Sequence, residues 1–151
     1  MLSEDLYLHG QASLFAACNT LKTQLSSVSP ALTVFKWDAA ADHTDLPETD
    51  LIGPFKYIAS NEGGLLVVTA QIVVSTLADT NLFRMDEIVN AAFKAFSPGR
   101  RLPLIDASNG APVGLLTCSD ETTALPIERA GSRPVKSVAV ELRSDRSMLR
   151  S

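Results

Sequence analysis

The residues best suited to acid–base or metal chemistry are few. The chain has only two histidines, His9 and His43. His43 lies between Asp42 and Asp45, and an imidazole with two carboxylates is a possible set of metal ligands. Ligands from neighbouring positions of one loop rarely fix the geometry of a metal ion, and this set supplies a single nitrogen. An exposed acidic loop is the better interpretation, and we expect no metal site.

A second candidate is a nucleophile at the end of a predicted strand, where the chain reads Cys118-Ser119-Asp120. A strand end can present a thiol or a hydroxyl, but an active nucleophile also needs a base placed beside it. The G-x-S-x-G pattern of a nucleophile turn is absent, and nothing in the sequence places a base. A strand end followed by a capping turn explains the segment.

Two further patterns are those of possible anion sites. Gly63 and Gly64 lack the G-x-x-x-x-G-K-[ST] and G-x-G-x-x-G contexts of phosphate-binding loops, and a hairpin turn accounts for them. Arg100 and Arg101 follow the end of a predicted helix, where basic residues are ordinary. We therefore predict that the protein is not an enzyme, and that it has no catalytic, cofactor-binding or metal-binding residues.

The composition indicates an ordinary folded protein. The 151 residues are enough for a core, and 46% are hydrophobic and 20% charged. A net charge of −4 and a pI near 5.1 argue against general nucleic-acid binding. Cys18 and Cys118 lie far apart, so we expect buried, reduced thiols. The acidic start lacks the basic region of a signal peptide, and residues 64–78 are too short and polar to cross a membrane.

One segment organises the rest of the chain. Residues 65–77 alternate between a wholly apolar face and a mixed face, which predicts a long strand covered fully on one side. Its length favours a bulge, a bend or two pairing partners. Residues 82–96 carry apolar side chains three and four positions apart, which predicts a helix packed on that strand. We expect this helix to bury four side chains against four from the strand: Met85, Val89, Phe93 and Phe96 against Leu66, Val68, Ile72 and Val74.

The remaining patterns complete a single domain over residues 1–151. A first helix begins near Asp5 or Gly10 and ends at Ser26, and further strands are predicted over residues 32–37, 51–60, 102–106, 113–118 and 135–143. The order α-β-β-β-α-β-β-β predicts an α+β fold with two helices packed on a largely antiparallel or mixed sheet. Residues 38–50 are predicted to form an acidic loop, residues 119–134 a long loop, and residues 144–151 a flexible tail.

Charge is distributed unevenly along the chain. Residues 38–62 contain six acidic residues and one lysine, a net charge of −5, and residues 129–150 contain six basic and two acidic residues, a net charge of +4. The two regions are either separate solvated surfaces or complementary parts of a contact between copies. Unlike patches give a head-to-tail contact, which closes into a ring when the rotation fits. The second interpretation makes six residues candidates for a subunit interface: Asp42, Asp45, Glu48, Arg129, Arg133 and Arg143.

The layout of elements resembles one family of structural proteins. A helix, a strand, a long loop and an extended hairpin are followed by the helix sequence NLFRMDEIV at residues 81–89 and by the strand sequence RPVKSVAV at residues 133–140. This order is similar to that of the tail terminator, or tail-completion, proteins of long-tailed bacteriophages. The resemblance covers nearly the whole chain, but it rests on layout and size and transfers no functional residue.

The resemblance implies a structural virion protein that is made and assembled in the host cytoplasm. Its copies would form a ring, expected to be a hexamer, that caps the tail tube and presents a surface for joining the head. The implied partners are other copies of the chain, the tail tube protein and a neck or head-completion protein, without a cofactor, a membrane or a specific nucleic acid. Two alternatives stay open. One is a neck or head-to-tail connector protein, and the other is a ligand-binding or enzymatic domain with a pocket near Trp37, His43 and Cys118.

Overall fold

The computed structural model describes residues 5–39, 46–119, 121–130 and 132–145. It contains two helices, one short 3₁₀ turn (Trp37–Ala39) and the strands of a single sheet. The helices are α1 (Leu6–Gln24) and α2 (Phe83–Ala95). The strands are β1 (Thr33–Val34), β2 (Leu51–Glu62), β3 (Leu65–Ser75), β4 (Arg101–Ile105), β5 (Pro112–Cys118), β6 (Thr123–Ala124), β7 (Glu128–Ala130) and β8 (Arg133–Ser144). The predicted α+β class and the order of the main elements are confirmed.

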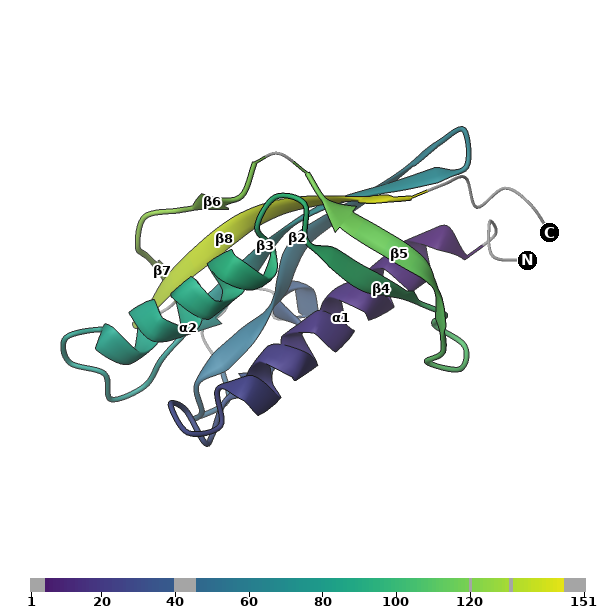
Figure 1. Cartoon of the computed structure of the whole chain (residues 1–151). Helices are drawn as coiled ribbons and strands as arrows, with labels where there is room; N and C mark the ends of the chain where they lie inside the picture. Colours follow the sequence, from purple (N-terminus) through teal and green to yellow (C-terminus); the bar gives the residue numbers. More distant parts are fainter. Residues whose placement is uncertain (1–4, 40–45, 120, 131, 146–151) are drawn as a thin grey trace.

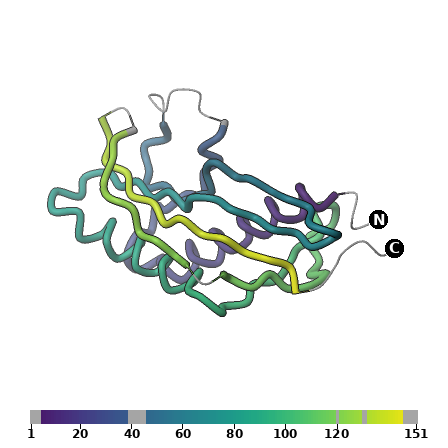
Figure 2. Tube along the Cα trace, turned by 90° about the horizontal axis from the view of Figure 1, so that it is seen from above, coloured from purple at the N-terminus to yellow at the C-terminus, as the bar shows by residue number. Residues whose placement is uncertain are grey.

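The sheet is mixed, and its strand order is β1-β2-β3-β8-β5-β4. Only β1 runs parallel to its neighbour, β2, and the other pairs are antiparallel. The long strand β3 has both of the partners that its length favours, because it pairs with β2 on one side and with β8 on the other. The bulge that we considered for β3 lies instead in its partner β2, between Phe55 and Ile58. Figure 2 looks onto the sheet and shows β8 running along β3.

Both helices lie on the same face of the sheet (Figure 1). The main core fills the space between them and the sheet, and it includes the predicted strand face of Leu66, Val68, Ile72 and Val74. Among the described residues, the opposite face, which we call the helix-free face, carries a small second cluster at one end, made of Trp37, Leu51, Val73 and Val135. The sheet is therefore fully covered on one side and largely open on the other.

The face of α2 that packs against the sheet is narrower than the sequence predicted. Met85, Val89 and Phe96 are buried as expected, but Phe93 is 39% exposed, so its assignment to the core was wrong. Each residue turns the helix by about 100°, so Phe93 lies well round the helix from Ala92, which is fully buried at the centre of the contact. The sheet does not reach that side of α2.

Three boundaries also differ from expectation. The loop predicted over residues 119–134 contains β6 and β7, which pair with β8 because β5 covers only its last residues, Leu142 to Ser144. The strand predicted over residues 32–37 ends at Val34, and Trp37 begins a 3₁₀ turn. Ser144, placed in the tail by the sequence, is the last residue of β8. Residues 40–45 of the acidic loop and residues 146–151 of the tail lie outside the described residues.

The two phenylalanines of α2 provide a matched test of this packing. Replacing Phe96, which is fully buried, with alanine should lower the free energy of unfolding by about 3–5 kcal/mol. The same change at Phe93 should cost less than about 1 kcal/mol, because this side chain is partly in water and lies outside the core. Urea denaturation of both variants measures the difference, and equal losses would contradict the observed orientation of α2.

Candidate functional site

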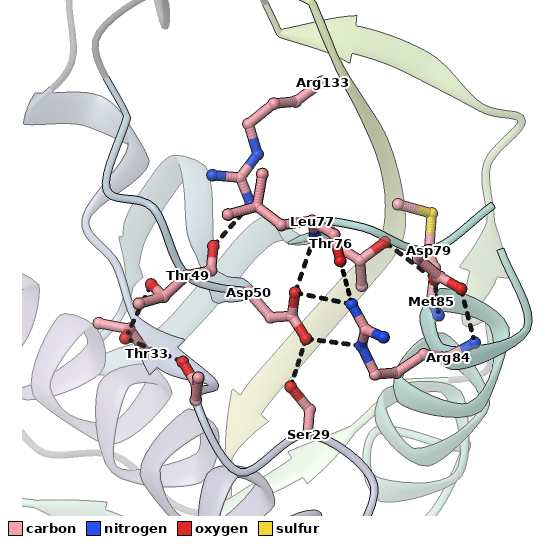
Figure 3. A network of polar contacts seen from close by, with 11 residues as sticks. Ser29, Thr33, Thr49, Asp50, Thr76, Leu77, Asp79, Arg84, Met85 and Arg133 are labelled. Atoms are coloured by element: carbon pink, nitrogen blue, oxygen red, sulfur yellow. Dashed lines mark hydrogen bonds and ion pairs between the residues drawn. The ribbon is translucent and has the colours of Figure 1, made fainter.

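The most connected polar site surrounds Asp50, at the start of β2 (Figure 3). Its carboxylate is buried and accepts hydrogen bonds from the Ser29 hydroxyl, from the Leu77 N–H at 2.8 Å and from Arg84, whose Nε lies 2.7 Å and Nη2 3.2 Å away. Arg84 also donates to the Leu77 carbonyl. The site therefore joins the segment after α1, the start of β2, the segment after β3 and the first turn of α2.

The carboxylate of Asp50 is saturated with donors and is not a free base. Burial raises its pKa, but the hydrogen bonds from Arg84, Ser29 and Leu77, with the charge of Arg84, outweigh burial and hold the pKa below its usual value. A catalytic carboxylate needs an open position toward a substrate. The function of this site is to fix four segments relative to one another.

Arg133, one of the predicted interface residues, lies close to this network and is engaged within its own chain (Figure 3). Its guanidinium donates to the Ser75 hydroxyl at 3.1 Å, to the Pro47 carbonyl at 2.7 Å and to the Thr49 carbonyl at 2.7 Å. The end of the acidic loop and the beginning of β8 thus meet inside one molecule. The sequence had suggested such a meeting only between two molecules.

The other predicted interface residues are more accessible. Glu48 is exposed near the start of β2, Arg129 donates only to the nearby Ser132 carbonyl at 3.3 Å, and Arg143 lies 3.7 Å from Glu141 on the same strand. Asp42 and Asp45 lie outside the described residues. The structure therefore leaves Glu48, Arg129 and Arg143 available for contacts with another molecule, and it does not bring them together within the chain.

Two residues of the alternative ligand pocket, Trp37 and Cys118, lie in different clusters. Trp37 is buried in the second cluster, whereas Cys118 belongs to the main core, and His43 lies outside the described residues. Both cysteines are unpaired, and burial raises the pKa of Cys18 to about 12 and also raises that of Cys118. Thiols with raised pKa values are poor nucleophiles near neutral pH.

The described residues also bear on metal binding and on membrane insertion. No group of three or more His, Cys, Asp or Glu side chains is placed to hold a metal ion in those residues. His9 is buried, and its Nδ1 accepts a hydrogen bond from the Ala107 N–H at 3.0 Å, which attaches α1 to the end of β4. Within the same described ranges, neither helix is both long and apolar enough to span a bilayer.

A broad groove crosses the helix-free face. It has a volume of about 990 Å³ and is bordered by Ile58 of β2 on one side and by Thr117, Ser119, Glu121 and Thr123 on the other. Its floor consists mainly of short or polar side chains from β3 and β8, namely Thr69, Gln71, Ala139 and Glu141. The groove is wide and lies on a sheet surface, which suits contact with another protein better than enclosure of a small molecule.

One edge of this face is open. The β2–β3 hairpin extends beyond the end of β8 (Figure 1), and β1 covers β2 only at Leu51 and Ile52. Of the described strands, none pairs with the outer side of β2 from Ile58 to Glu62. The Leu66 N–H points toward β8, where it meets the Ser144 hydroxyl at 2.9 Å, so its β2 partner Asn61 directs its own backbone groups outward.

The opposite edge of the sheet is protected. Pro103, in the middle of β4, has no N–H to offer, and the Ile105 N–H donates to the Ser13 hydroxyl of α1 at 2.8 Å. Natural proteins usually blunt exposed strand edges in this way, whereas β2 has a bulge between Phe55 and Ile58 and no proline from Ile58 to Glu62. Ile58, which is 64% exposed on that edge, adds an apolar contact surface.

The sequence reasoning missed both the Asp50 network and the open edge. Asp50 was counted with the solvated acidic residues, although it directly precedes an apolar strand. Its partner Arg84 is 34 positions away, so no local pattern joins them. Ile58 was assigned to a strand without knowledge of which neighbours would cover it. No model of a known protein family matches the sequence, and no curated protein matches it significantly.

The ion pair of Asp50 with α2 can be tested against a surface pair that joins α2 to β8. Replacing Arg84 with methionine should lower the free energy of unfolding by about 2–4 kcal/mol, because a buried carboxylate loses its cation. Replacing Lys136 with methionine removes its pair with Asp86, which is 54% exposed, and should cost less than about 1 kcal/mol. Urea denaturation at pH 7 compares the two, and an Arg84 variant no worse than the Lys136 variant would contradict the structural role of Asp50.

The lowered pKa of Asp50 also predicts a pH dependence. A carboxyl whose pKa is lower in the folded state stabilises the protein above its unfolded pKa, which is near 3.8, and this contribution is lost as the pH falls through the folded pKa. The difference in unfolding free energy between the wild type and Asp50→Asn should therefore be constant from pH 5 to 7, and it should shrink below about pH 4. A difference that does not change down to pH 2 would refute the assignment.

Proposed function

We propose that this protein is a structural assembly protein of the tail terminator type, whose copies form a ring on the end of a phage tail tube. The observation that supports the proposal most strongly is the open edge of β2 on a projecting hairpin, with Ile58 exposed on it. An unpaired strand edge with an exposed apolar side chain favours pairing with another chain. In a stable monomer such an edge promotes unwanted aggregation, whereas in an assembly it forms the contact between subunits.

The asymmetry of the sheet favours a head-to-tail contact. One edge is open along β2, and the other is blunted by Pro103 and by the contact of β4 with α1. The two sides of the molecule therefore present unlike surfaces, and unlike surfaces join heterologously. Repetition of one heterologous contact through a fixed rotation gives a closed ring, which is the form expected of a tail terminator.

Charge would set the register of this contact. Glu48, Arg129 and Arg143 have side chains that reach solvent and are available for pairing across subunits, and Asp42 and Asp45 add acidic charge at positions outside the described residues. Exposed pairs contribute little affinity individually but penalise a wrong register. Arg133 is excluded from this role because it is bound to Pro47, Thr49 and Ser75 of its own chain.

The action of such a ring is steric. A ring seated on the last layer of the tail tube covers the surface that would accept another layer of tube protein, and it offers a different surface to a neck protein. No bond is made or broken, so the residues that matter are those of the contact surfaces. The groove on the helix-free face provides one broad surface of this kind.

Native mass spectrometry and electron microscopy of the purified protein test the proposal. We expect a closed ring, or a monomer that becomes a ring on purified tail tubes. Ile58→Lys should raise the concentration needed for half-assembly by at least about tenfold, because it buries a charge in the joint. Phe83→Lys is the matched control, since Phe83 is 70% exposed on α2 and distant from the β2 edge, and it should assemble normally.

Two outcomes would count against the proposal. A protein that stays monomeric at all concentrations, with and without tail tubes, would exclude a ring. A ring that binds purified necks and ignores tail tubes would favour the connector alternative over the terminator.

A further inference from the structure

A second surface lies on the helical side of the molecule, away from the groove described above. The second halves of α1 and α2 and the start of β4 enclose a cleft of about 540 Å³. Beside the polar Ser13, Thr20 and Gln24 of α1, small or apolar side chains that are partly buried line much of it: Ala16, Ala17, Ala91, Ala95 and Leu102. Small side chains let another backbone approach closely, and no described segment of the chain fills this cleft.

The rim of the cleft is cationic. Lys94, Arg100 and Arg101 line it, and all three are exposed. Within the described residues, none of these three side chains donates a hydrogen bond or forms an ion pair, and no acidic side chain lines the cleft. In a chain with a net charge of −4, three unpaired cations around one apolar cleft form a local positive site.

We propose that this cleft binds an acidic amphipathic segment of a partner protein. The apolar side of such a segment would cover the alanines and Leu102, and its carboxylates would meet Arg100, Arg101 and Lys94. Arginine favours carboxylates because its planar donors match their two oxygens. Nucleic acid fits less well, since a phosphate backbone has no apolar side to bury against the alanines. This inference does not depend on the ring, because the cleft lies on the helix-covered face.

The probe is a fluorescein-labelled peptide of Leu, Ala and Glu, designed as an amphipathic helix with the glutamates along one side. Fluorescence anisotropy should show saturable binding that weakens as salt rises. The same peptide with lysine in place of glutamate should not bind. A labelled DNA duplex and a labelled single strand complete the set, and both should bind at least about tenfold more weakly than the acidic peptide at the same salt concentration.

Two variants with matched controls locate the binding. Arg100→Glu with Arg101→Glu should raise the Kd by at least about tenfold, while Lys22→Glu with Lys36→Glu makes the same change of net charge outside the cleft and should have little effect. Ala16→Phe should weaken binding by filling the cleft, and Asn19→Phe, on an exposed position of α1 outside it, should not. All four variants change residues that lie outside the buried core, and circular dichroism checks their fold.

Three results would overturn the proposal. The first is equal binding of the acidic and basic peptides. The second is loss of binding in the control variants to the same degree as in the cleft variants. The third is tighter binding of DNA than of the acidic peptide, which would make the cleft a phosphate site.

Discussion

A single buried carboxylate holds together segments that are distant in the sequence. Asp50 accepts hydrogen bonds from Ser29, Leu77 and Arg84, and Arg84 returns one to the Leu77 carbonyl. A buried charge lowers the stability of the fold unless it is paired and fully hydrogen-bonded. Other positions of these segments would leave the carboxylate without partners and are therefore unfavourable. It fixes α2 relative to the start of β2 and the end of β3, and with that it fixes the face of α2 that meets the sheet. Arg133 extends the same region to β8.

The sequence predicted what depends on local periodicity. The long strand β3, the helix α2 and the hairpin between β2 and β3 follow from alternation, three- and four-residue spacing and two glycines, and all are present. The prediction that Phe93 is buried was wrong, because periodicity shows which way the apolar face of a helix points but not how wide the buried part of that face is. Strands β6 and β7 were missed because each is short and has no pattern of its own. They pair with the part of β8 that β5 does not reach.

The candidate surfaces depended even less on local pattern. Charge counts pointed to the acidic loop and the basic end of the chain, yet Arg133 proved to be used inside the molecule. The open edge of β2 becomes visible only when the order of strands is known, because an edge is defined by the neighbour that is absent on that side. The cleft between the helices likewise joins residues of α1 to residues of α2 and β4, which lie tens of positions later in the chain.

The hairpin turn has a consequence for how this protein can vary. Gly63 and Gly64 both have positive φ, and an added side chain at Gly63 would meet no atom within 4 Å. No described atom stands where a side chain at Gly63 would lie, so adding one pair of residues to each strand would move the tip outward by about 7 Å without disturbing the core. An insertion of one residue in one strand would instead exchange its two faces. The hairpin can therefore become longer or shorter over evolution by two residues per strand at a time, while the rest of the fold stays the same.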